Sequence, residues 1–145
     1  MTASGYTQNY APSNANDNNT STYWESTNNA FPQWLQADLG STQSVGSITL
    51  TLPPATAWAT RTQTLSVLGS TDGANYTTLV ASAGYTFNPA TGNTATISLP
   101  SSTSERYLKL NITANTGWPA GQVSEFEIYS GSTGAPTVLS RRLVP

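Results

Sequence analysis

The stretch Ser47-Ile48-Thr49-Leu50-Thr51-Leu52 alternates apolar side chains with hydroxyl-bearing ones. Successive side chains of a β-strand point to opposite faces, so this pattern predicts a strand with one buried and one solvent-facing side. Similar alternation or a short apolar run recurs in residues 34–39, 64–67, 94–99, 107–112 and 125–128. Turn signals separate these segments at Pro53-Pro54, Asp72-Gly73 and Asn88-Pro89. No window has the spacing of an amphipathic helix, and many short strands joined by turns predict an all-β sandwich or jelly roll.

The composition limits the function. The chain has 145 residues, enough for one domain with a real core, and only seven acidic and five basic residues. It has no basic patch, which argues against a nucleic-acid partner, and no apolar run of membrane-spanning length. The absence of Cys and His excludes thiol nucleophiles, Ser-His-Asp triads, disulfides and ordinary zinc sites. A surface rich in Ser, Thr and Asn favours a secreted, extracellular protein.

The two ends of the chain differ in composition from its middle. Residues 1–3 do not open a signal peptide. Residues 130–136 have the composition of a linker, and Leu143-Val144-Pro145 is typical of a truncated protease site left by expression. We therefore expect a domain over residues 4–130, then a linker and an expression tail over 131–145, and a module cut from a larger protein.

Residues 14–24 concentrate oxygen-bearing side chains in a short loop that ends in Trp24. Calcium prefers six to eight oxygens from carboxylates, carbonyls and hydroxyls, and Asp17 with its neighbours could supply most of them. Glu125, late in the chain, could bring a second carboxylate. The alternative is an Asx-rich surface loop whose side chains satisfy their own backbone.

Two tryptophans lie in loops rather than in predicted strands. Trp58 falls in residues 53–61 and Trp118 in residues 115–122, and Arg61 and Gln122 follow them closely. Aromatic faces beside planar hydrogen-bonding groups are suited to a sugar ring. The alternatives are that each tryptophan fills the core, and that Arg61 forms a structural ion pair with Asp38 or Asp72.

Five segments together resemble a known family. They are residues 17–24, 32–40, 70–76, 106–110 and 124–129, and they occur in the same order as in a coagulation-factor type C, or discoidin, domain. The chain is most similar to bacterial carbohydrate-binding modules of family 32. This resemblance covers most of the chain, and it implies an eight-stranded antiparallel jelly-roll β-sandwich appended to a secreted glycoside hydrolase.

The resemblance also implies a calcium site, and it favours the first interpretation of the oxygen-rich loop. The ligands that match the family's pattern are Asn14, Asp17, Asn19, Thr22, Ser124 and Glu125. The ion would be structural, tying the N-terminal loop to the last strand.

For the sugar, the family uses an aromatic residue from its last loop and an arginine from a middle loop, which match Trp118 and Arg61. Galactose-binding members commonly use a histidine, which this chain lacks, so galactose is not expected. The segments 58–61 and 117–122 resemble a subgroup attached to glucan-degrading enzymes. The expected ligand is therefore a neutral glucan, held by Trp58, Arg61, Trp118, Gln122 and Glu25.

Three classes of function remain. The first is a monomeric, non-catalytic polysaccharide-binding module in a larger multidomain enzyme. The second is an adhesion domain for a protein or lipid surface, which the shortage of basic residues disfavours. The third is a glycosidase using two of Glu25, Asp38 and Glu125. Asp38 has the position of a structural strand-end residue, Glu125 matches a metal ligand, and the chain is short for a catalytic cleft. We therefore expect no enzymatic activity.

Overall fold

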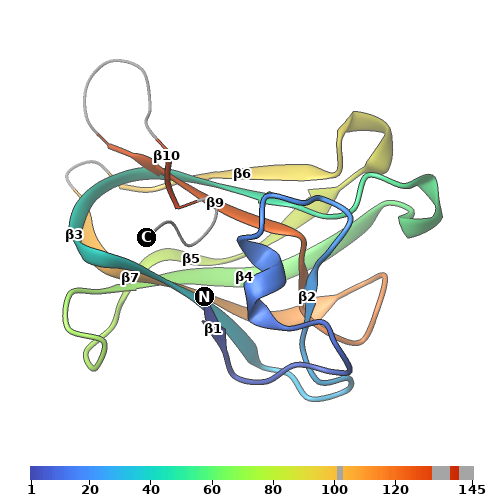
Figure 1. Cartoon of the computed structure of the whole chain (residues 1–145), viewed down its shortest axis with the longest axis horizontal. Helices are drawn as coiled ribbons and strands as arrows, with labels where there is room; N and C mark the ends of the chain where they lie inside the picture. The colour runs from blue at the N-terminus through green and yellow to red at the C-terminus, as the bar shows by residue number, and fades with distance from the viewer. Residues whose placement is uncertain (101–102, 132–137, 141–145) are drawn as a thin grey trace.

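The computed structural model describes residues 1–100, 103–131 and 138–140 (Figure 1). All its strand pairs are antiparallel, and they form one eight-stranded sheet and one two-stranded sheet. The strands are β1 (Thr2–Ala3), β2 (Trp24–Glu25), β3 (Gln33–Thr51), β4 (Arg61–Ser70), β5 (Thr77–Phe87), β6 (Thr94–Ser98), β7 (Ser104–Asn115), β8 (Gln122–Val123), β9 (Glu125–Ser130) and β10 (Val138–Ser140). Three short 3-10 helices accompany them: η1 (Pro12–Ala15), η2 (Thr56–Trp58) and η3 (Pro89–Thr91). The predicted all-β sandwich is confirmed.

The long strand β3 belongs to both layers of the sandwich. Its first half pairs with β1 and β7, and its second half pairs with β6 and β9. The register shifts between Asp38 and Gln43, where Gly40 has a φ of 84°, which glycine adopts without steric cost. The strand bends sharply at this place, on the left of Figure 1. One layer is therefore β1, β3, β7, β4 and β5, and the other is β6, β3, β9 and β10.

The core lies between these layers. Alternate residues of the predicted strands point into it, and the largest fully buried ones include Leu35, Leu50, Leu65, Leu110 and Phe126. Burying one such side chain contributes about 1.5–3 kcal/mol relative to leaving it exposed. The alternation in the sequence was therefore sufficient to predict β4, β6, β7 and β9, but it predicted β3 as two separate strands, at residues 34–39 and 47–52.

Strand β5 was not predicted, because most of its side chains are exposed or half-buried and only Phe87 is fully buried. It pairs with β4 alone, at the edge of its layer, so its sequence needs no alternation. Strand β1 pairs with β3, and β10 pairs with β9. The predicted domain limits of 4 and 130 stay predictions, and Leu143-Val144-Pro145 lies outside the described residues.

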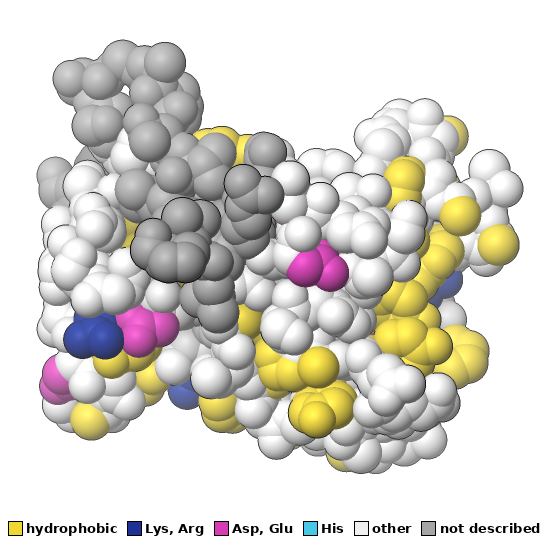
Figure 2. Space-filling view, in the orientation of Figure 1, with side chains coloured by type: hydrophobic (Ala, Val, Ile, Leu, Met, Phe, Trp, Pro, Cys, Tyr) yellow, Lys and Arg dark blue, Asp and Glu magenta, His cyan; other side chains and the backbone are white. Residues whose placement is uncertain are grey.

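The loops that carry the candidate sugar-binding residues meet at the end of the sandwich away from the bend of β3 (Figure 1). Figure 2 shows few charged side chains on the face in view, and hydrophobic ones gathered toward that same end. Within the described residues, no helix is long and apolar enough to cross a membrane.

Candidate functional site

A pocket of about 350 Å³ lies where β2 and β8 meet the loops before β4 and before β8. Its lining contains all five residues expected to hold a sugar, which are Glu25, Trp58, Arg61, Trp118 and Gln122, together with Gln8, Tyr10, Tyr23 and Ala57. The volume is at the lower end of the range for pockets that bind small ligands.

A buried chain of hydrogen bonds crosses the floor of the pocket. Nη1 of Arg61 donates to Oε1 of Gln122 at 2.8 Å, and Nε2 of Gln122 donates to Oε1 of Glu25 at 2.8 Å. The backbone of Gln122 is fixed by Gln63, whose side chain donates to the Gln122 carbonyl at 2.8 Å and accepts from its N–H at 3.0 Å. Because these groups already hold one another, the pocket is organised before any ligand enters it.

Arg61 is held closely by its neighbours. Its guanidinium lies over the Trp58 ring, with Cζ 4.7 Å from the ring centroid, and Nε and Nη2 both donate to the Trp58 carbonyl. Gly117 also lies close to it, because a Cβ at Gly117 would come within 2.6 Å of Nε. Burial lowers the pKa of Arg61, while Tyr23 and Glu25 oppose that change. An arginine remains charged even so, because its ordinary pKa is far above neutrality.

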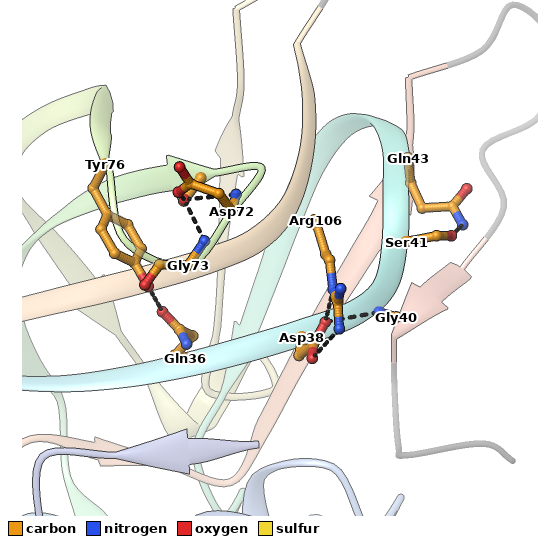
Figure 3. A network of polar contacts seen from close by, with 10 residues as sticks. Gln36, Asp38, Gly40, Ser41, Gln43, Asp72, Gly73, Tyr76 and Arg106 are labelled. Carbon is orange, nitrogen blue, oxygen red and sulfur yellow. Dashed lines mark hydrogen bonds and ion pairs between the residues drawn. The ribbon is translucent and has the colours of Figure 1, made fainter.

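Arg61 makes no ion pair with Asp38 or Asp72, so that alternative was wrong. Asp38 forms an ion pair with Arg106 instead, in which Nε donates to Oδ1 at 2.8 Å and Nη2 donates to Oδ2 at 3.0 Å (Figure 3). Asp72 accepts hydrogen bonds from the backbone of Ala74 and Asn75 within its own turn. Asp38 is thus a structural residue, as its position at a strand end suggested.

The two loop tryptophans differ in exposure. Trp118 is 47% exposed, so it does not fill the core. Trp58 is half-buried: it packs against the core and also lines the pocket. Trp58 therefore fills part of the core, and its role in holding a sugar stays a prediction.

Tyr10 and Tyr23 form a wall of the pocket that was not predicted. Their rings stack at 4.6 Å with an interplanar angle of 15°, and the Tyr23 ring meets Trp58 edge-on at 4.7 Å. Burial, and then contact with Tyr10, raises the pKa of Tyr23 above its usual range. The sequence held one signal for Tyr23. It lies two residues before Glu25, so the two side chains should point to the same face, whereas Trp24 between them points into the core.

The oxygen-rich loop folds as a compact turn around Asp17. Oδ1 of Asp17 accepts from the N–H of Asn19 at 3.0 Å, and Oδ2 accepts from the Thr22 hydroxyl. The Ser124 hydroxyl donates to the carbonyl of Thr20 at 2.8 Å, which brings the loop to the start of β9. The fold thus carries the loop to the residues that precede and open β9.

Glu125 is the electrostatic anomaly of this region. It is 3% exposed, and neither of its carboxylate oxygens has a hydrogen-bond partner among the described residues. Burial, and then the charge of Asp17, raises the pKa of Glu125 to about 8. A buried, ionised carboxylate without a partner is unfavourable, so it either takes up a proton or is compensated by a cation.

The donor set at this place fits a hard cation. The described residues contain no group of three or more Asp, Glu, His or Cys side chains that could hold a metal ion together. Two carboxylates and several neutral oxygens would therefore have to bind the cation. Calcium accepts such mixed oxygen ligands. Asp17 and Glu125 would provide the charge, and the other oxygens would come from Asn14, Asn19, Thr22 and Ser124.

Comparisons with known proteins identify the family and support the fold. Residues 1–126 match the F5/8 type C domain family. A search of curated protein sequences finds no significant match. Many solved structures are similar to the chain.

Three of these structures are sugar-binding modules. The CBM32 module of AlyQ, solved with 4,5-unsaturated mannuronic acid, is 26% identical with a TM-score of 0.72, and the match covers 88% of this chain and 91% of that one. Chitosan-binding module 1 from a chitosanase/glucanase of Paenibacillus sp. IK-5 is 26% identical with a TM-score of 0.66, covering 89% and 92%. A pectin-binding module is similar in fold, with 24% identity, a TM-score of 0.74 and coverage of 91% and 90%.

Proposed function

Because this chain belongs to the F5/8 type C domain family, we propose that it is a non-catalytic polysaccharide-binding module whose ligand is a neutral glucan. The observation that carries the proposal is the pocket itself, in which Trp118 and Trp58 stand beside the bonded series Arg61–Gln122–Glu25. A sugar ring packs its C–H face on an aromatic ring and exchanges hydrogen bonds through its hydroxyls. The pocket offers both kinds of contact.

The charge of the pocket favours a neutral sugar over an acidic one. Its two formally charged lining residues, Arg61 and Glu25, have opposite signs and are linked through Gln122. A site for a polyuronate would need unbalanced positive charge. The mannuronic acid seen with the AlyQ module is therefore not the expected ligand here.

The proposed setting is extracellular, in a protein that also carries a glycoside hydrolase. The related Paenibacillus module derives from a chitosanase/glucanase, which supports such an arrangement. A tethered binding module raises the effective concentration of the enzyme at its substrate without any chemistry of its own.

Calcium is the proposed structural ion between Asp17 and Glu125. Its support is the pair of unpartnered carboxylate oxygens on buried Glu125. When bound, the ion would supply the missing charge and tie residues 14–22 to the first residue of β9.

Native affinity gels test the sugar proposal. The chain, with calcium present, is run through gels containing α-1,3-, α-1,6-, β-1,3- or β-1,4-glucans, with galactan, xylan, alginate and pectin alongside. We expect retardation by one class of glucan, lost in Trp118→Ala and kept in Tyr6→Ala. Tyr6 is the matched control, because it is also exposed, at 52%, but does not line the pocket.

Two results would overturn the proposal. Retardation mainly by alginate or pectin would show that the charge argument is wrong. No retardation by any polysaccharide, with the protein folded, would favour the adhesion alternative, which binding to liposomes or to matrix proteins would then examine.

A further inference from the structure

One short stretch of chain joins the oxygen-rich loop to the pocket. Thr22 belongs to the loop, and Glu25, three residues later, lines the pocket. The same holds on the partner strand, because Gln122 of β8 lines the pocket and Glu125 opens β9 three residues later. Since β2 and β8 pair with each other, the two-stranded sheet has candidate cation ligands at one end and pocket residues at the other.

Tyr23 makes the most direct connection between the two places. Its carbonyl accepts a hydrogen bond from Nδ2 of Asn14, in the loop, at 3.1 Å. Its ring stacks on Tyr10 and meets Trp58 edge-on at 4.7 Å. Trp58 in turn holds the guanidinium of Arg61 through its ring and its carbonyl. A displacement of the loop therefore reaches Arg61 through two packed rings.

A cation would give the loop two different resting positions. With the ion present, Asp17 and Glu125 are both drawn toward it. Without the ion that attraction is lost, and Asp17, on the exposed loop, is freer to move than Glu125, which is buried in the sheet. The driving force thus acts on the segment that ends in Tyr23.

We infer that Tyr23 is a positioning residue through which a divalent cation bound between Asp17 and Glu125 sets the Trp58–Arg61 wall of the pocket. This inference rests on the proposed function as far as sugar affinity is concerned. It makes the cation and the sugar thermodynamically linked ligands, so that each raises the affinity for the other by the same factor. A cation that only stabilised the fold would leave the arrangement of the Trp58 ring unchanged.

The first experiment needs no sugar. The whole chain is labelled with fluorotryptophan, freed of metal with a chelator and titrated with calcium, while calorimetry measures calcium binding. The Trp58 fluorine resonance, assigned with Trp58→Phe, should shift as calcium binds. Trp34 is the internal control, because its ring contacts Lys109 on the outer face of β3 and should not respond.

Variants of Tyr23 decide whether that residue carries the effect. In Tyr23→Leu calcium should still bind, but the Trp58 resonance should no longer follow it. Tyr23→Phe, which keeps the ring, should restore the response. The inference fails if calcium does not bind, if Trp58 does not respond in the unmodified chain, or if Tyr23→Leu responds equally.

The second experiment measures sugar affinity with calcium and with a chelator, using the affinity gels and the glucans named above. Removing calcium should weaken binding about five- to tenfold, within the usual range of coupling between sites. In Tyr23→Leu the ratio of the sugar affinity with calcium to the sugar affinity without it should fall toward one. Equal affinity in both conditions would overturn the link to sugar binding. Failure of every glucan to bind in either condition would overturn the proposed function, whereas the fluorine experiment would still decide the coupling.

Discussion

Replacing Gly117 with alanine should displace Arg61 without removing any group from the pocket. The added Cβ would lie 2.6 Å from Nε and 2.7 Å from Cζ of Arg61, whereas ordinary contacts begin near 3.4 Å. The guanidinium would have to retreat by roughly 0.8 Å. Its Nε now donates to the Trp58 carbonyl at 3.1 Å, near the upper limit for such a hydrogen bond, so a shift of that size should disturb this bond.

The displaced Arg61 should no longer donate its hydrogen bond to the sugar. The loss of one such charge-assisted hydrogen bond corresponds to about 1.5–3 kcal/mol, or roughly a 10- to 150-fold weaker affinity. Overpacking should lower the free energy of unfolding by about 1–3 kcal/mol. Affinity gels give the first quantity and chemical denaturation the second. Gly84→Ala is the matched control, because its Cβ would meet only the Thr62 methyl group, at 3.1 Å, outside the pocket lining. If Gly117→Ala bound glucan as tightly as the unmodified chain, the position of Arg61 would not determine affinity.

Three further outcomes follow from individual contacts. Trp58→Ala should weaken both folding and sugar binding, by about 1 kcal/mol or more each, because the ring packs on the core and on Arg61. Trp118→Ala should weaken sugar binding alone. Thermal unfolding and affinity gels together will separate the two effects. Calcium at a hundredfold excess over Kd should stabilise the unmodified chain by about 2.7 kcal/mol, and Glu125→Gln should abolish this stabilisation. The calcium-free protein should be at least as stable with this substitution as without it. If the variant were still stabilised by calcium, Glu125 would not be a ligand. The Arg106 side chain lowers the pKa of Asp38, so their ion pair should stabilise the fold above pH about 4 and lose that contribution as the pH falls toward the lowered value. The effect should be small for so exposed a pair, and Asp38→Asn should flatten the acid limb of a stability–pH curve.

The sequence predicted best those elements whose residues alternate between core and solvent. In β7, for example, Leu108, Leu110 and Ile112 are fully buried, and the residues between them are not. It could not predict β5, whose edge position requires little burial. Pairings such as Arg106 with Asp38, 68 residues apart, depend on register, which a single sequence does not reveal.

The candidate sugar-binding residues came from the resemblance to a family, and the structure explains why they converge. Glu25 and Gln122 are 97 residues apart, yet their side chains bond at 2.8 Å because β2 and β8 pair. Tyr10 was not predicted, because nothing in the sequence indicated that it lies near these residues. It lies outside any predicted strand, and its place in the pocket depends on its stacking on Tyr23 and on the hydrogen bond that its carbonyl accepts from the Glu25 N–H, at 3.1 Å.

The two-stranded sheet is too short to hold itself together, since each of its strands has only two residues. It persists because Trp24 and Val123, which pair across it, are buried in the core, and because the Trp24 indole donates to the carbonyl of Gly5 at 3.0 Å. The residues that alternate with this buried pair, Glu25 and Gln122, are thereby fixed in the pocket. Core packing thus determines where the site lies. A change at Trp24 should therefore damage the pocket and the cation loop together, whereas a change at Trp118 should alter sugar binding alone.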